Sequence, residues 1–297
     1  MPASSPQHAG PESEATAPGP SPAGEVKPRV RVAVAGIAGR MGREVGRAIH
    51  ADPDCVLVGA VDVAPHAQGR DAGQLAGVGE LGVPVCASLA EMWESAHPEV
   101  LVDFTIAPAA FVNAQAALER GVSPVIGTTG LTADQVETLR RLASERATGA
   151  FIAPNFSIGA VLMMVFARQA ARYLPEVEII ELHHEKKVDA PSGTALRTAQ
   201  LILETRGLRM AQRPSQEDVR LEGARGGDLE GIRIHSVRLP GYVAHQEVIF
   251  GGHAQTLTIR HDSTDRTSFM PGMLLAVKRV RSLSGLVVGL ENLLDLE

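Results

Sequence analysis

The first clear hydrophobic pattern in the chain begins at residue 30. Over residues 30–35 three valines alternate with one arginine and two alanines, which predicts a buried β-strand with little polar character. A glycine-containing turn follows at residues 36–42. Apolar residues then recur at helical spacing up to Ile49, and this helix is expected to stop before Asp52 and Pro53. The ordered chain therefore opens with a strand, a turn and a helix.

Strands and helices continue to alternate up to residue 153. The apolar runs predict four further strands, at residues 56–61, 100–106, 123–126 and 150–153. Helices are predicted at residues 109–120 and 132–146, and the second opens on a capping box formed by Thr132 and Gln135. This alternation is typical of an α/β fold with a doubly wound parallel sheet, in which ligands bind at the carboxyl ends of the strands.

The pattern changes after residue 158. An apolar, methionine-rich helix is expected at 158–174, a strand from 177 and a second helix at 192–205. Three further strands, at 231–239, 242–250 and 256–261, are consecutive and are therefore expected to pair antiparallel. A long final helix is expected at 266–281. The pattern predicts a second α+β domain, built from one sheet and its covering helices, over residues 157–265.

Composition narrows the classes of protein that fit. Hydrophobic residues make up 44% and charged residues 21%, as in soluble globular proteins, and the net charge of −6 gives no general attraction to nucleic acid or anionic membranes. No apolar run approaches the roughly 20 residues that span a bilayer, and no export signal is recognised. Cys55 and Cys86 are expected to be buried thiols of a reducing compartment, so a cytoplasmic location is expected. Residues 1–28 hold seven of the 19 prolines and are predicted to be a disordered tail.

The turn after the first strand has the composition of a dinucleotide-binding loop. Its glycines follow the spacing G-x-x-G-x-x-G, with Ala38 where a second glycine is often found. Small residues let the backbone approach a pyrophosphate, and the helix N-terminus faces it. Asp62 lies twenty residues beyond Gly42 at the tip of the second strand, where it is expected to accept hydrogen bonds from an adenosine ribose. The alternative is a loop aspartate that starts a turn before Pro65.

Residues 177–195 carry the densest chemistry of the chain. A β-branched strand runs into two histidines and two lysines, breaks at 189–191 and restarts as a helix at Ser192, Gly193 and Thr194. Imidazole suits proton transfer near neutral pH, ammonium groups attract carboxylates, and exposed amides at a helix start bind anions. The stretch therefore predicts a site for a small, acidic, protonatable substrate. The turns that end two strands are expected to line the nicotinamide side: Gly127, Thr128 and Thr129, and Ala153, Pro154, Asn155 and Phe156.

Several alternatives remain open for these side chains. Strict alternation would put His183, Glu185 and Lys187 on one face and His184 and Lys186 on the other, but the break at 189–191 leaves the inward face undecided. A solvated edge strand is one alternative. A metal site at the histidines and Glu185 is another, although no third ligand at metal-like spacing is present, and no metal is predicted. Arg238, His245 and Glu247 are expected to form cross-strand surface pairs, with a cleft wall as the alternative.

The chain resembles the bacterial 4-hydroxy-tetrahydrodipicolinate reductase family, also called dihydrodipicolinate reductase. The resemblance rests on five segments: residues 36–42 with their Gly-Arg-Met-Gly core, 127–130, 153–157, 183–194, and Arg238 with Gly241. It implies a Rossmann-like domain at 29–156 that is completed by 266–297, and a mixed-sheet substrate domain that also forms a homotetramer. It further implies hydride transfer from NADH or NADPH to C4 of the ring of a dicarboxylate, in the diaminopimelate route to lysine.

The resemblance also implies a role for each matched residue. His183 corresponds to the proton donor, Lys187 to a second catalytic residue and His184 to a substrate contact, while Ser192, Gly193 and Thr194 hold a ring carboxylate. The pyrophosphate is held by Gly36, Ile37, Ala38, Gly39, Arg40 and Met41. The segments 127–129 and 153–156, together with Arg266, complete the cofactor pocket.

The chain departs from the family pattern at two positions. Glu185 and Lys186 stand between the histidines and Lys187, so Lys186 is an alternative basic residue. Asp62 is followed by Val63, where members that use NADPH readily carry an arginine, so a preference for NADH is expected. Two rival functions are a related amino-acid dehydrogenase and a non-catalytic dinucleotide-sensing protein.

Overall fold

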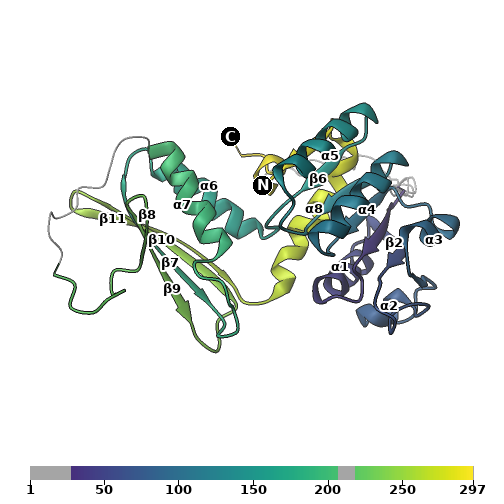
Figure 1. Cartoon of the computed structure of the whole chain (residues 1–297), viewed down its shortest axis with the longest axis horizontal. Helices are drawn as coiled ribbons and strands as arrows, with labels where there is room; N and C mark the ends of the chain where they lie inside the picture. Colours follow the sequence, from purple (N-terminus) through teal and green to yellow (C-terminus); the bar gives the residue numbers. More distant parts are fainter. Residues whose placement is uncertain (1–27, 207–217, 297) are drawn as a thin grey trace, which may run out of the picture.

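The computed structural model describes residues 28–206 and 218–296. The predicted disordered tail lies outside these residues except for Pro28, so this prediction is not examined by the structure. The described residues form two sheets with their own helices (Figure 1). In this part of the chain no helix is both long and apolar enough to cross a membrane.

The first sheet has seven strands, all parallel, in the order β12-β6-β5-β4-β1-β2-β3. Alternate residues of β1 enter cores on opposite faces: Val32 and Val34 pack in one, Ala33 and Ala35 in the other. Burial on both faces is what the near-continuous apolar sequence of β1 predicts. The doubly wound parallel sheet is confirmed. Its strands are β1 (Val30–Ala35), β2 (Cys55–Val61), β3 (Val85–Cys86), β4 (Val100–Asp103), β5 (Ser123–Ile126), β6 (Ala150–Ile152) and β12 (Leu286–Val288).

The helices of this sheet match the predicted ones in position but not at every end. The capping box at Thr132 and Gln135 is present in α5. The strand predicted at 100–106 ends earlier, because β4 stops at Asp103. The helix predicted at 109–120 begins earlier, because Pro108 lies in the first turn of α4, where a missing N–H costs nothing. Residues 63–99, which the pattern left unassigned, contain α2, β3 and α3. The helices are α1 (Arg40–Ala51), α2 (Ala72–Ala76), α3 (Leu89–Ser95), α4 (Ala107–Glu119) and α5 (Ala133–Glu145).

The second sheet has five strands in the order β11-β10-β7-β9-β8. The predicted antiparallel series of three consecutive strands is only partly right. β10 and β11 pair antiparallel as expected, but β9 does not pair with β10, because β7 lies between them, parallel to β9 and antiparallel to β10. β7 carries apolar side chains on both faces, such as Ile179 and Ile180, which favours a central place. The strands are β7 (Glu176–His183), β8 (Gly227–Leu229), β9 (Ile232–Arg238), β10 (Ala244–Gly252) and β11 (Gln255–Ser263).

Two helices, α6 (Ile158–Ala170) and α7 (Gly193–Arg206), pack together over one face of the second sheet (Figure 1). The chain passes between the two sheets at residues 153–157 and returns at 264–269. The predicted final helix is divided, because Pro271 fits the first turn of an α-helix and not its interior. It consists of η1 (Arg266–Phe269), α8 (Met270–Arg279) and η2 (Val280–Ser282); η3 (Leu290–Leu293) follows β12.

Candidate active site

A cavity of about 750 Å³ lies at the carboxyl ends of β1, β2 and β4. Four of the predicted cofactor residues line it: Gly36, Ala38, Gly39 and Asp62. Ile37 is buried in the core beneath the turn, and Arg40 is exposed at the start of α1. Val63, which follows Asp62, lines the cavity too. The other lining residues were not singled out by the sequence analysis: Ala35, Val61, Ala64, His66, Ala87, Ser88, Leu89, Phe104, Thr105, Ile106, Ala109 and Asn113.

The glycine turn has the geometry of an anion cradle. Gly36 has a φ of +83°, which favours glycine, and a Cβ on Gly42 would lie 2.0 Å from the carbonyl oxygen of Gly36. The first turn of α1 has no acidic residue and no side-chain cap, so its amides remain available to a ligand. The turn therefore fits the pyrophosphate of a dinucleotide.

Asp62 makes the hydrogen bonds of a loop aspartate and also faces the 750 Å³ cavity. Its Oδ1 accepts a hydrogen bond from Ala64 N at 2.9 Å, as a loop aspartate does, while its Oδ2 accepts one from Ala38 N at 2.8 Å. Each carboxylate oxygen keeps a further lone pair, and Asp62 is among the residues that line the 750 Å³ cavity. Its carboxylate can therefore hold the glycine turn and a ribose hydroxyl together.

A buried aspartate that the sequence analysis missed supports the loop at residues 127–129. Asp103 accepts hydrogen bonds from Thr105 N at 2.9 Å, from Asn113 Nδ2 at 2.8 Å and from Thr128 Oγ1 at 3.3 Å. Gly127 faces the ring of Phe104, where a Cβ would lie 2.3 Å from ring carbons. Gly127, Thr128 and Thr129 are not among the residues that line the 750 Å³ cavity; they lie beside it.

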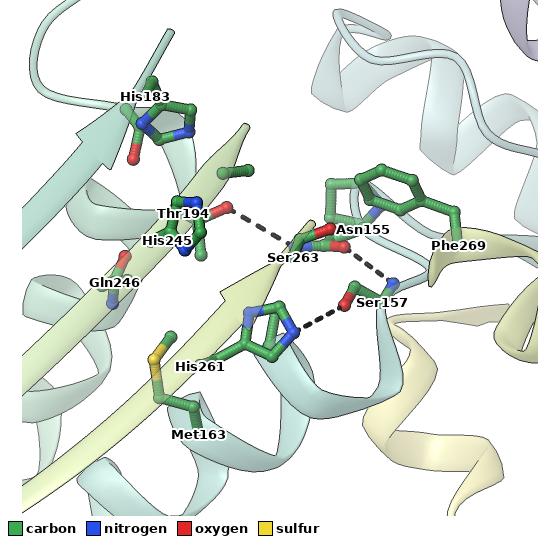
Figure 2. Close-up of a pocket in the computed structure, with 14 residues that line it drawn as sticks. Asn155, Ser157, Met163, His183, Thr194, His245, Gln246, His261, Ser263 and Phe269 are labelled. Carbon is green, nitrogen blue, oxygen red and sulfur yellow. Dashed lines mark hydrogen bonds between the residues drawn. The ribbon is translucent and has the colours of Figure 1, made fainter. Parts of the chain in front are cut away.

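A second cavity, of about 190 Å³, lies between strands of the second sheet, the starts of α6 and α7 and the connecting segment 153–157 (Figure 2). Five predicted site residues line it: Pro154, Asn155, His183, Ser192 and Thr194. The remaining walls come from α6, β10, β11 and η1 through Ser157, Ala160, Met163, Ala244, His245, Gln246, His261, Ser263 and Phe269. Ala153 and Phe156 are buried behind this wall, and Arg266 is exposed on η1.

His183 is held by a buried carboxylate. Its Nδ1 lies 2.5 Å from Oε2 of Glu181, which is completely buried and which Arg238 binds with two hydrogen bonds of 2.7 and 2.8 Å. Burial alone would raise the pKa of Glu181, but hydrogen bonds from His183, Arg238 and Ser236 outweigh it and lower the pKa to about 2. Glu181 is therefore an anion at neutral pH, and Nε2 is the nitrogen of His183 left for a substrate.

The start of α7 has the exposed amides and hydroxyls that the predicted anion cradle requires. Ser192 caps the helix, since its Oγ accepts a hydrogen bond from Ala195 N at 3.2 Å. This leaves the hydroxyl hydrogen of Ser192 free to donate. The space beside Gly193 is open, and the first-turn amides of Gly193 and Thr194 precede the intrahelical hydrogen bonds. Amides and hydroxyls thus converge at one side of the cavity.

The two candidate lysines occupy a turn, not a strand. β7 ends at His183, and Lys187 N donates to the carbonyl oxygen of His184 at 3.1 Å, so strict alternation does not extend beyond His183. The Lys187 ammonium is held by both oxygens of Asp189 at 2.7 and 2.8 Å, while Lys186 is exposed. His184, Lys186 and Lys187 do not line the 190 Å³ cavity.

The predicted surface pairs are only partly found. Glu247 pairs with Arg260 across the strands at 3.1 Å, as expected. His245 also forms a cross-strand pair, because its Nδ1 contacts Asp262 on β11 at 2.6 Å, and it lines the cavity as well. Arg238 instead binds the buried Glu181.

His261 was missed and also lines the cavity. Its Nε2 lies 3.2 Å from Ser157 Oγ, and burial lowers its pKa. Within residues 28–206 and 218–296, no cluster of three or more His, Cys, Asp or Glu side chains is arranged to hold a metal ion.

Comparisons with known proteins agree on one family. The family model described as "Dihydrodipicolinate reductase, N-terminus" matches residues 30–156, and its C-terminal counterpart matches 159–294. Proteins named 4-hydroxy-tetrahydrodipicolinate reductase from Moorella thermoacetica and Listeria welshimeri are 54% and 51% identical to this chain. Each alignment covers 90% of this chain, with 98% and 100% of the respective relative. A solved dipicolinate-bound dihydrodipicolinate reductase from Paenisporosarcina sp. TG-14 is 42% identical, covers 90% of this chain and 100% of its own, and superposes with a TM-score of 0.81.

Proposed function

The chain belongs to the dihydrodipicolinate reductase family, and from this premise we propose that it reduces 4-hydroxy-tetrahydrodipicolinate in lysine and diaminopimelate biosynthesis, with His183 as the proton donor. The observation that carries the residue assignment is the convergence of His183 and the start of α7 on one cavity beside the coenzyme-binding sheet. The alignments with these reductases extend over nearly the whole length of each relative. This favours the reductase over a related amino-acid dehydrogenase or a sensor without turnover.

The chemistry follows from the charges that the reaction creates. When bound, NADH or NADPH supplies a hydride, for which we propose as acceptor C4 of the unsaturated ring that the hydroxylated substrate forms by loss of water. The resulting enamine carbon is electron-rich and needs a proton, which His183 Nε2 is placed to donate. The substrate is a dicarboxylate in this proposal. Ser192, Gly193 and Thr194 hold one carboxylate. In this proposal His184 is a substrate contact and Lys187 a second catalytic residue, both in the turn that follows β7 and outside the lining of the 190 Å³ cavity.

We propose that the coenzyme spans the two cavities. Gly36 to Met41 and Asp62 bind its pyrophosphate and adenosine ribose, while the segments 127–129 and 153–156 and Arg266 adjoin its nicotinamide end. Asp62 and His66 are the titratable side chains among the residues that line the coenzyme cavity. An anionic carboxylate next to the uncharged Val63 repels a 2′-phosphate, which supports a preference for NADH.

A coupled assay tests the function and the coenzyme preference together. Pyruvate and aspartate semialdehyde are condensed by the preceding synthase, and the consumption of NADH or NADPH is followed with this enzyme added. We expect turnover that requires the synthase, with a higher kcat/KM for NADH. Turnover without the synthase would support an amino-acid dehydrogenase, no turnover would support a sensor, and a higher kcat/KM for NADPH would refute the preference.

We also propose a homotetramer formed through the second sheet. The helices α6 and α7 cover one face of this sheet, and Ile180, Leu182 and Ile249 project from the other by the alternation of β7 and β10. Partly exposed apolar side chains on a sheet face favour burial against another copy. Light scattering of the full chain is expected to give about four times the chain mass of 31.3 kDa, and a monomer mass would contradict the proposal.

The proposal includes the domain boundaries that the sequence predicted. Residues 29–156 and 266–297 form the coenzyme domain and residues 157–265 the substrate domain, which the pairing of β12 with β6 supports. A cytoplasmic location is proposed with it, supported by the two buried, free cysteines and by the biosynthetic role of the relatives. Fractionation of the source cells tests this location.

A further inference from the structure

Glu181 contacts three parts of the substrate site with one carboxylate. Oε2 meets His183 Nδ1 at 2.5 Å and accepts from Arg238 Nη1 at 2.8 Å. Oε1 accepts from Arg238 Nη2 at 2.7 Å and from Ser192 N at 3.2 Å. Arg238 also donates to the carbonyl oxygen of Asp189 at 2.7 Å, so the turn after β7 is tied to the same group. The side chain of Glu181 has no exposed surface.

The charges around His183 explain why an anion is needed there. Arg238 reaches this site from β9, His245 lines the cavity from β10, and the Lys187–Asp189 ion pair lies in the following turn. Glu181 and Arg238 together carry no net charge. Without Glu181, a protonated His183 would lie beside the uncompensated guanidinium of Arg238, and like charges at short range disfavour the protonated form.

The same carboxylate also fixes geometry. Its bond to Nδ1 sets the orientation of the imidazole and directs proton transfer to Nε2. Its bond to Ser192 N engages the amide that precedes the first turn of α7, which leaves Gly193, Thr194 and the Ser192 hydroxyl to bind a substrate carboxylate. The position of the acid and the position of the anion cradle therefore depend on one side chain.

We propose that Glu181 is a positioning residue that places a compensating anion against the proton donor His183 and aligns it with the carboxylate cradle at the start of α7. This inference deepens the proposed function and rests on the role of His183 as the proton donor. Arg238 acts with Glu181 as its counter-ion and is not among the residues that line the cavity.

The test is the pH dependence of kcat/KM for Glu181→Gln, which keeps the size of the side chain and removes its charge. The high-pH limb, on which the acid loses its proton, is expected to move to lower pH by about one to two pH units. Activity at pH 8 is then expected to fall by about 10- to 100-fold, with partial recovery at pH 6. KM for the dicarboxylate is also expected to rise, because the start of α7 loses a fixed partner.

Two further variants separate charge from packing. Glu178→Gln is the matched control, because Glu178 lies on the same strand, faces the opposite side and also binds an arginine and a histidine, Arg225 at 2.6 Å and His235 at 2.8 Å. The high-pH limb of kcat/KM for Glu178→Gln is expected at the same pH as for the wild-type enzyme. Glu181→Asp keeps the charge with a shorter reach, so its limb is expected to stay within about half a pH unit of wild type while KM rises. It also serves as the test if Glu181→Gln does not fold.

The outcomes distinguish this inference from the proposed role of His183. A folded Glu181→Gln enzyme whose loss of activity is the same at every pH, or a Glu178→Gln enzyme with an equal shift, overturns the role of Glu181. If His183→Ala retains wild-type kcat, the assignment of His183 as the proton donor is rejected, and the inference about Glu181 is rejected with it. If His183→Ala is inactive but the high-pH limb of Glu181→Gln stays at the wild-type pH, the proposed function stands and only this inference is rejected.

Discussion

Replacement of His183 by alanine is expected to lower kcat by about 10²- to 10⁴-fold, the usual range for the loss of a general acid. The reason is that Nε2 is the proton source next to the substrate cavity, while Nδ1 is held by Glu181. The measurement is steady-state kcat and KM in the coupled assay. His253→Ala provides a matched control, because this histidine is exposed in the turn between β10 and β11 and lies far along the strand from Ala244.

Lys187→Ala extends this test to the turn after β7. It is expected to lower kcat and also to raise KM for the dicarboxylate, because an ammonium near the cavity offsets substrate charge. Lys186→Ala, at the exposed neighbour, is expected to change neither value by more than about twofold. A wild-type kcat for both His183→Ala and Lys187→Ala would reject the catalytic assignment. If Lys186→Ala lowered kcat more than Lys187→Ala does, the catalytic lysine would be Lys186.

Replacement of Gly42 by alanine is expected to abolish tight coenzyme binding. A Cβ at this position would lie 2.0 Å from the carbonyl oxygen of Gly36 and 2.8 Å from the Cα of Ile37, so the backbone of the turn must move. Overpacking of this kind also lowers the free energy of unfolding by about 1–3 kcal/mol. The Kd for NADH, measured by fluorescence, is expected to rise at least about tenfold, since the anion cradle depends on this close approach.

Gly46→Ala is the matched control for this substitution. Gly46 lies one turn further along the same helix, and its added Cβ would lie 3.1 Å from Ile37 Cδ1 and 3.2 Å from Ala76 Cβ. These contacts need shifts of a few tenths of an ångström, far smaller than the 2.0 Å contact at Gly42 requires. The Kd of Gly46→Ala for NADH is expected to stay near the wild-type value. A folded Gly42→Ala protein with a wild-type Kd would show that the turn tolerates a methyl group and would contradict the role given to this glycine.

The sequence analysis missed Glu181, Gln246 and His261, because local sequence patterns show their roles only weakly. Glu181 shares the alternation that buries Val177 and Ile179, so the pattern of β7 already puts its side chain on the inner face. A charged residue in that position requires partners, and Arg238 is 57 residues away in the chain. His261 and Gln246 lie on strands that reach the cavity through sheet pairing, which no local pattern reports.

Local chemistry was sufficient for the parallel sheet, the glycine turn and the chemical character of residues 183–194, because short-range periodicity and turn composition encode them directly. Tertiary structure decided the rest. It put β7 between β9 and β10, ended β7 at His183, and brought Glu181, Arg238 and Ser192 into one hydrogen-bonded group. These features depend on which distant strands pair and on how a buried charge is compensated. Both are set by packing across the whole fold, beyond the reach of neighbouring residues in the chain.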